Sequence, residues 1–224
     1  IRNLPVVPEI SEIDINESEE NLETLAKQAT ELRESYRELN LDLLEYLGNY
    51  TDGLNLPDFG LFQPSNENVL DKTTEDYEKL QIERARTIRN GRAVTVEATA
   101  RYKPEDKDEF ETDTYGYTET DFFEAFTLTG LSDEEAALVE AFVPVAVEEE
   151  IGGFRDNATK TNSLIDRLKG MTLPDPDDVA DDLRRYIETK ERADELNEKI
   201  EKTDQLIDEI VYDFYDLTDE EIEI

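Results

Sequence analysis

Two segments, one near each end of the chain, place hydrophobic residues alternately three and four positions apart. This spacing puts the side chains on one stripe of an α-helix and is the heptad pattern of helices that pack side by side. The first stripe consists of Leu22, Leu25, Ala29, Leu32, Tyr36, Leu39, Leu43 and Tyr46. The second consists of Tyr186, Thr189, Ala193, Leu196, Ile200, Thr203, Ile207, Ile210 and Phe214. The pattern predicts two long helices, the first of which ends at Gly48.

A narrow hydrophobic stripe needs a partner helix, and the two predicted helices can provide it for each other. We expect an antiparallel pair within one molecule, with the intervening residues as an insertion. The alternative is that each stripe pairs with another chain. A shorter helix over 156–169 is expected as a third member of the bundle. The last long helix should follow Pro174 and Pro176 and be capped by Asp177 or Asp178.

The middle of the chain has the period of two that is typical of a strand with one buried face. The alternating hydrophobic residues are Val94, Val96, Ala98, Ala100 and Tyr102. Asn90-Gly91 stands between this strand and an earlier extended run, which is the strongest short-range signal for a β-hairpin. A third strand is expected near 122–129.

A short helix should follow the third strand, because Ser132 and Glu135 have the spacing of a capping box. We expect it to end before Pro144, and we expect residues 103–114 to form a mobile loop. The predicted fold class is therefore α+β, mainly α: long antiparallel coiled-coil-like helices with a small antiparallel β-hairpin and helix module inserted between them. The predicted division is 1–50, then the module at 51–153, then a helical return at 154–224 that pairs with 18–47.

The charge balance is strongly acidic, with 59 acidic and 23 basic residues and a net charge of −36. An acidic chain can be disordered, but the regular hydrophobic spacing favours a folded, salt-adapted protein whose charges are screened. The chain contains no cysteine, histidine or tryptophan, which excludes disulfides and thiolate zinc sites and argues against a transition-metal site. No hydrophobic run is long enough to cross a bilayer. We expect a cytoplasmic protein without a membrane partner.

Residues 84–103, which we call the cationic run, contain six basic residues and one acidic residue, Glu97. One interpretation is a DNA-contacting hairpin with Asn90 at its tip. The other is that the arginines pair with the surplus carboxylates around them, and the sequence leaves both open. Arg155 and Lys160 lie in a second polar segment with either a DNA-contacting or a helix-capping role. The candidate DNA-binding residues are thus Arg84, Arg86, Arg89, Asn90, Arg92, Arg101, Lys103, Arg155 and Lys160. No catalytic, cofactor-binding or metal-binding residue is predicted.

The C-terminal run IDEIVYDFYDLTDEEIEI (207–224) resembles the end of adenine-specific restriction–modification DNA methyltransferases. The lead-in IRNLPVVP (1–8) and the runs EATARYKPEDKDEFETDTYGYTET, AALVEAFVPVAVEE and GGFRDNATKTNSLIDRL extend the resemblance over nearly the whole chain. They are similar to haloarchaeal members, of the type IIG-like and phage-defence (BREX-like) groups. Asp216 stands where the family usually has glycine.

The resemblance implies that the chain, which starts with Ile1, is the C-terminal part of a longer enzyme. That parent would transfer a methyl group from S-adenosylmethionine to adenine N6 in duplex DNA. The chain has neither an Asn-Pro-Pro-Tyr motif for a flipped adenine nor a glycine-rich turn for the cofactor, so we expect it to be catalytically silent alone. We expect it to help recognise DNA. The alternative is a protein-docking module of a phage-defence complex that does not contact DNA. Whether the parent carries a nuclease stays open.

Overall fold

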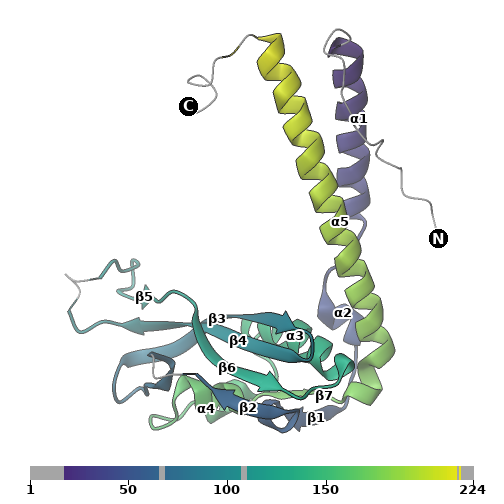
Figure 1. Ribbon diagram of the computed structural model, residues 1–224. Helices are drawn as coiled ribbons and strands as arrows, with labels where there is room; N and C mark the ends of the chain where they lie inside the picture. Colours follow the sequence, from purple (N-terminus) through teal and green to yellow (C-terminus); the bar gives the residue numbers. More distant parts are fainter. Residues whose placement is uncertain (1–17, 66–68, 107–109, 216, 218–224) are drawn as a thin grey trace. The chain divides into compact units, whose positions relative to one another are not determined.

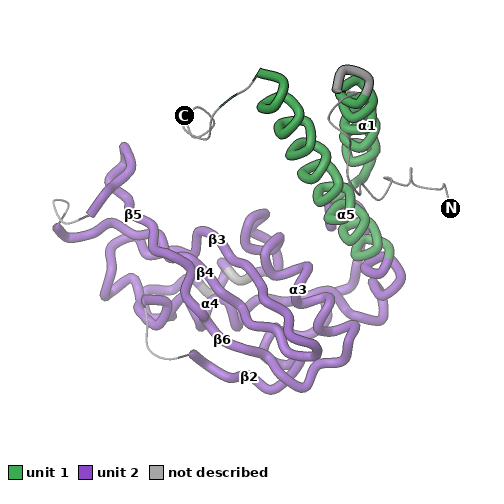
Figure 2. Tube along the Cα trace, turned by 45° about the horizontal axis from the view of Figure 1, so that its top comes forward, with its two compact units in different colours: residues 1–41, 185–224 green, residues 42–184 purple. Residues whose placement is uncertain are grey.

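The computed structural model describes residues 18–65, 69–106, 110–215 and 217 (Figure 1). The chain is α+β, with a five-stranded antiparallel sheet, a two-stranded sheet, and a long C-terminal helix that packs on the N-terminal helix. It divides into two compact units (Figure 2). The helical unit extends up to Leu41 and resumes at Arg185, and the compact α+β unit covers 42–184. Residues 42–50 and 154–184, which the sequence-based division assigns to the helical parts, therefore lie in the α+β unit.

The helical unit consists of α1 (Ser18–Arg37) and the part of α5 (Pro176–Phe214) that follows residue 184. The two helices lie side by side and run in opposite directions in both views (Figures 1 and 2). The buried members of the two predicted stripes within these helices are Leu25, Ala29 and Leu32 on α1 and Tyr186, Ala193, Leu196 and Thr203 on α5. The predicted pairing of the two helices within one molecule is confirmed.

One ion pair also joins these helices. Nη2 of Arg33 lies 2.6 and 2.7 Å from the two carboxylate oxygens of Asp204. Both side chains remain about 40% exposed. An exposed pair of this kind contributes about 1 kcal/mol or less, so the hydrophobic stripes provide most of the stabilisation.

The first predicted helix is interrupted, which corrects the expectation of one helix up to residue 46. α1 ends at Arg37 and a separate helix, α2 (Leu43–Leu47), follows. The side chain of Asp42 accepts a hydrogen bond of 2.9 Å from the backbone N–H of Leu44 and so caps a new helix. Local bonds of this kind compete with helix continuation. Leu43 and Leu47 are buried in the α+β unit, and Gly48, at φ +56°, ends α2 as predicted.

The main sheet has the order β2-β6-β4-β3, and β5 (Thr118–Glu119) pairs with the end of β4. Its other strands are β2 (Leu61–Pro64), β3 (Glu78–Asn90), β4 (Ala93–Lys103) and β6 (Phe123–Thr129). All five predicted hydrophobic residues of β4 are buried, and the predicted third strand is β6. The predicted hairpin is β3–β4.

The turn of this hairpin lies one residue later than predicted. Asn90 pairs with Ala93, so the two loop residues are Gly91 and Arg92. Gly91 has φ +60°, a conformation that glycine adopts without steric cost. A positive φ at the first loop residue alone is typical of the type II′ hairpin turn.

A two-stranded sheet of β1 (Asp52–Asn55) and β7 (Thr172–Pro174) was not predicted from sequence. A Cβ atom at Gly53 would lie 2.8 Å from the Cα of Asp175, so the backbones approach too closely for another residue. Asp175 then caps α5 by accepting a hydrogen bond of 3.0 Å from the N–H of Asp177. The cap is thus Asp175, with Pro176 in the first helical position, rather than Asp177 or Asp178.

The helix α3 (Asp133–Glu148) begins with the predicted capping box. The Ser132 N–H donates to Glu135 Oε2 over 2.7 Å, and the Glu135 N–H donates to Ser132 Oγ over 3.1 Å. The predicted end before Pro144 is wrong, because α3 continues for another turn. Proline leaves the carbonyl of Glu140 without its helical donor. The hydroxyl of Thr87 on β3 donates to that carbonyl over 2.8 Å and replaces the missing bond.

Replacing Thr87 by valine should therefore lower the free energy of unfolding by about 1–2 kcal/mol, since a half-buried carbonyl loses its donor. In a Pro144→Ala background the helix regains an N–H for Glu140, so the same replacement should cost less. A double-mutant cycle by urea denaturation measures this difference. If Thr87→Val lowered the free energy of unfolding equally in the unmodified chain and in the Pro144→Ala background, the Thr87 hydroxyl would not be replacing the missing helical N–H.

The predicted helix over 156–169 is shorter and lies elsewhere. η4 (Phe154–Asn157), a 3₁₀ turn, is followed by α4 (Leu164–Lys169), which Ser163 caps. Leu164, Ile165 and Leu168 are buried within the α+β unit, where α4 contacts η2 (Leu56–Asp58) and η3 (Val69–Asp71). The helix is therefore part of the α+β core and not a third member of the helical unit.

Candidate functional site

The two faces of the main sheet have different surroundings. Thr87 and its cross-strand neighbour Val96 lie on the face that α3 covers, and Lys169 of α4 lies 4.7 Å from the ring centre of Phe62 on the same face. The opposite face, which we call the open face, carries Ile88, which is 50% exposed, and Arg86, whose side chain is 55% exposed. Strand alternation therefore divides the cationic run between the two faces.

Arg84 and Arg86 lie on the open face, and each is bound to a carboxylate. Arg84 Nε and Nη2 lie 2.7 Å from Glu119 Oε1, and Arg86 Nε lies 2.5 Å from Glu97 Oε2. Both guanidinium groups lie over the ring of Phe122, at 5.3 and 4.2 Å from its centre. Cation–π contacts of this length stabilise the arginines in place.

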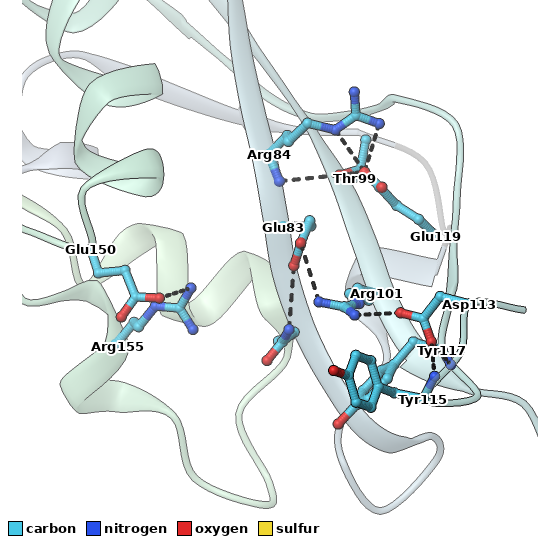
Figure 3. A network of polar contacts seen from close by, with 11 residues as sticks. Glu83, Arg84, Thr99, Arg101, Asp113, Tyr115, Tyr117, Glu119, Glu150 and Arg155 are labelled. Carbon is cyan, nitrogen blue, oxygen red and sulfur yellow. Dashed lines mark hydrogen bonds and ion pairs between the residues drawn. The ribbon is translucent and has the colours of Figure 1, made fainter.

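A buried hydroxyl connects Arg84 to the same carboxylate (Figure 3). Thr99 donates to Glu119 Oε1 over 2.7 Å and accepts from the backbone N–H of Arg84 over 3.1 Å. This N–H lies beside a β-bulge in β3, between Ile82 and Ala85, where the regular ladder is interrupted. Thr99 thus satisfies a strand N–H and orients the partner of Arg84.

Arg101 binds two carboxylates at the far end of the hairpin (Figure 3). Its Nη2 lies 2.6 Å from Asp113 and its Nη1 lies 3.3 Å from Glu83. The ring of Tyr117 lies 4.4 Å from its guanidinium carbon and 4.9 Å from Lys103 Nζ. Backbone N–H groups of Tyr115 and Tyr117 also donate to Asp113, so this carboxylate orders the turn in front of β5.

These contacts lower the pKa of the Asp113 carboxyl below its ordinary 3.8, chiefly through the Tyr117 N–H and then through Arg101. A lowered pKa means that the folded state binds this proton less tightly than the unfolded chain does. The stabilisation is therefore present above pH 3.8 and lost as the pH falls through the lower, folded-state value. NMR titration should place Asp113 below 3.8, and Arg101→Gln should raise its pKa part of the way back. An unchanged value in the variant would contradict the contribution of Arg101.

The remaining residues at the hairpin tip bind the start of α3. Arg89 lies 3.6 Å from Asp133 and 3.5 Å from Glu140, and its Nε donates to the Gly91 carbonyl over 2.9 Å. Arg92 Nε donates to the Leu131 carbonyl over 2.5 Å. Asn90 forms the closing pair of the hairpin with Ala93. These side chains attach the hairpin to the capped end of α3.

Arg155 and Lys160 lie on the segment between α3 and α4. Arg155 Nη2 lies 2.8 Å from Glu150, and the backbone carbonyl of Lys160 accepts from the Thr74 hydroxyl over 3.3 Å. The structure thus brings together Arg84, Arg86, Arg101 and Lys103 on one side of the hairpin and directs Arg89 and Arg92 elsewhere. That the nine candidates contact DNA stays a prediction.

A pocket of about 730 Å³ was not anticipated from the sequence. It lies in the α+β unit between β1 and the first turns of α3 and α5, and its lining includes Asp52, Leu54, Phe59, Glu134 and Arg184. Four separate segments form it, so no local pattern marks it. Two of its carboxylates, Glu135 and Asp175, are already used as helix caps.

Among the described residues no helix is both long and hydrophobic enough to span a membrane, and no three acidic, histidine or cysteine side chains group as a metal site would require. Comparison with known proteins identifies no relative: no protein-family model, curated protein or solved structure matches this chain.

Proposed function

We propose that this chain is a non-catalytic docking and scaffolding part of an adenine-specific restriction–modification DNA methyltransferase. The identity of the parent rests on the sequence resemblance described above, and with it S-adenosylmethionine as the parent's cofactor. The α+β unit is an insertion between two paired helices, an arrangement that suits a module carried by a larger enzyme. We expect the paired helices to connect the module to the parent and the module to bind a protein partner.

The observation that carries docking is that the arginines of the cationic run already have acceptors within the chain. Contact with DNA phosphates through Arg84, Arg86 or Arg101 would compete with Glu119, Glu97 and Asp113. The net charge of −36 provides no electrostatic attraction of the chain to DNA.

The open face, by contrast, combines balanced charges with the exposed side chains of Ile88 and Leu61. On an acidic protein, a face with balanced charge can approach another acidic protein with little repulsion. This supports a subunit of a phage-defence complex as the partner.

DNA recognition is the second candidate, and a specific observation favours it. Four cationic side chains of the hairpin lie on two aromatic rings, Arg84 and Arg86 on Phe122 and Arg101 and Lys103 on Tyr117. The side chains of Arg84 and Arg86 are still 60% and 55% exposed. They could exchange a carboxylate for a phosphate or a guanine edge without a change of fold.

Paired substitutions in the intact parent distinguish the two functions. Arg84→Gln with Arg86→Gln removes two charges from the open face, and Ile88→Glu changes its exposed hydrophobic residue. If the module docks, Ile88→Glu should abolish binding of the purified complex subunits while both variants bind the specific duplex within about twofold of the unmodified protein. If it reads DNA, the double variant should lose about tenfold or more in duplex affinity, roughly 1–3 kcal/mol, in high potassium chloride.

The choice of arginines matters for this experiment. From the sequence alone, Arg89 and Arg92 are equally suitable positions for substitution. In the structure, however, Arg89 pairs with Asp133 and Glu140, and Arg92 donates to the Leu131 carbonyl. Charge reversal there would loosen the hairpin from α3 and confuse a folding defect with a loss of binding. Circular dichroism of each open-face variant provides the control for folding.

A further inference from the structure

Arg167 on α4 is a buried cation whose hydrogen-bond acceptors are neutral. The residue is only 6% exposed to solvent. Nη1 donates to the Leu80 carbonyl over 3.1 Å and Nη2 donates to the Thr159 carbonyl over 3.2 Å. A guanidinium has five N–H donors. These two bonds use two of them, and in the described part of the chain the buried Nε has no acceptor.

Among the described residues, no carboxylate forms an ion pair with the Arg167 guanidinium. Burial lowers the pKa of the Arg167 guanidinium, and the neighbouring positive charge of Arg155 lowers it further. Arg155 itself pairs with Glu150 at 2.8 Å. Burying a charge without a partner is strongly unfavourable.

Although the chain has 59 acidic residues, none of those described forms an ion pair with Arg167. An anion from the solvent would supply the missing negative charge. It would accept the remaining N–H groups of Arg167 and offset the repulsion from Arg155. The burial of Arg167 favours a compact, singly charged anion over phosphate, whose larger charge is harder to desolvate.

We propose that Arg167, with Arg155 beside it, binds a halide ion between η4 and α4, chloride being the halide a salt-adapted protein would meet. The bound ion would lock α4 to the start of β3, because Arg167 already contacts the Leu80 carbonyl there. Since the ion binds the folded state, chloride would stabilise the α+β unit beyond the general effect of ionic strength. This inference is independent of the proposed function.

The experiment exchanges the anion while it keeps the potassium concentration constant. The unfolding midpoint of the intact chain should shift upwards as potassium chloride replaces potassium glutamate, and the shift should saturate. Arg167→Met should abolish this shift, whereas Lys169→Met, which removes a partly exposed cation from the same helix, should retain it. An equal shift in the unmodified chain and in Arg167→Met would overturn the proposal.

A direct readout covers the case in which Arg167→Met fails to fold. Crystals of the unmodified chain grown in potassium bromide should show an anomalous bromide peak in contact with the Arg167 guanidinium. Broadening of the chloride-35 NMR signal should report the same site in solution and be reversed by bromide. An ordered water at Nε, or bromide only on the surface, would overturn the proposal. So would bromide at Arg167 without chloride-35 broadening, which indicates an adventitious ion only.

Discussion

Replacing Phe126 by alanine is expected to lower the free energy of unfolding of the α+β unit by about 3–5 kcal/mol. Phe126 lies on β6 between β2 and β4 and is fully buried. Its ring centre lies 4.7 Å from that of Phe62, and its cross-strand neighbours are Val96 and Pro64. Alanine would leave a cavity that the surrounding strands cannot close. Urea denaturation in high salt, followed by circular dichroism and tyrosine fluorescence, measures the loss.

Phe123 on the same strand provides a matched control. Its replacement by alanine removes the same atoms, but Phe123 is 36% exposed. Phe123→Ala should cost about 1 kcal/mol, within the range for a half-exposed hydrophobic group. Similar losses for both variants would show that Phe126 does not occupy the core of the sheet.

Replacing Leu196 by aspartate is expected to separate the paired helices, at a cost of about 3 kcal/mol or more. Leu196 is a fully buried stripe residue of α5. The change removes a hydrophobic side chain and places a carboxylate in a fully buried position. Because a short isolated helix is marginally stable in water, α1 should lose its structure when its partner stripe is disrupted. Circular dichroism at 222 nm should therefore decrease in amplitude before the α+β unit unfolds.

Asn197→Asp tests whether burial, rather than added negative charge, causes this effect. It introduces the same side chain one position later in α5, where the residue is exposed. We expect a change of about 0.5 kcal/mol or less, as for most surface substitutions. If Asn197→Asp reduced the helical signal as strongly as Leu196→Asp, the burial argument would be wrong.

Several elements follow from local sequence signals. The heptad stripes predicted the helical pair, the alternation of 94–102 predicted β4, and Ser132 with Glu135 predicted the start of α3. Each signal is carried by residues that are only a few positions apart in the sequence. They reflect which face of a segment is hydrophobic and how its first N–H groups are satisfied, and both are written in consecutive residues.

The errors occurred where a distant residue changed the local outcome. α3 passes Pro144 because Thr87, more than fifty residues earlier, replaces the missing donor. The first hydrophobic stripe continues through Leu43 in the sequence, but Leu43 is buried in the α+β unit. It therefore belongs to a new helix, which Asp42 caps. The helix expected over 156–169 is confined to α4 for the same reason: its hydrophobic residues pack against η2 and η3.

For the candidate site, the sequence by itself determined that six basic residues gather within 84–103 on a hairpin. Only the tertiary structure decided what each of them binds. Strand alternation directs Arg86 to the open face and Arg89 towards α3, and register then selects Glu97 for one and Glu140 for the other. Arg167 illustrates the same limit, since its hydrogen-bond acceptors are the backbone carbonyls of Leu80 and Thr159. Charge is a property of the residue, but its partner is set by the packing of segments that are remote in the chain.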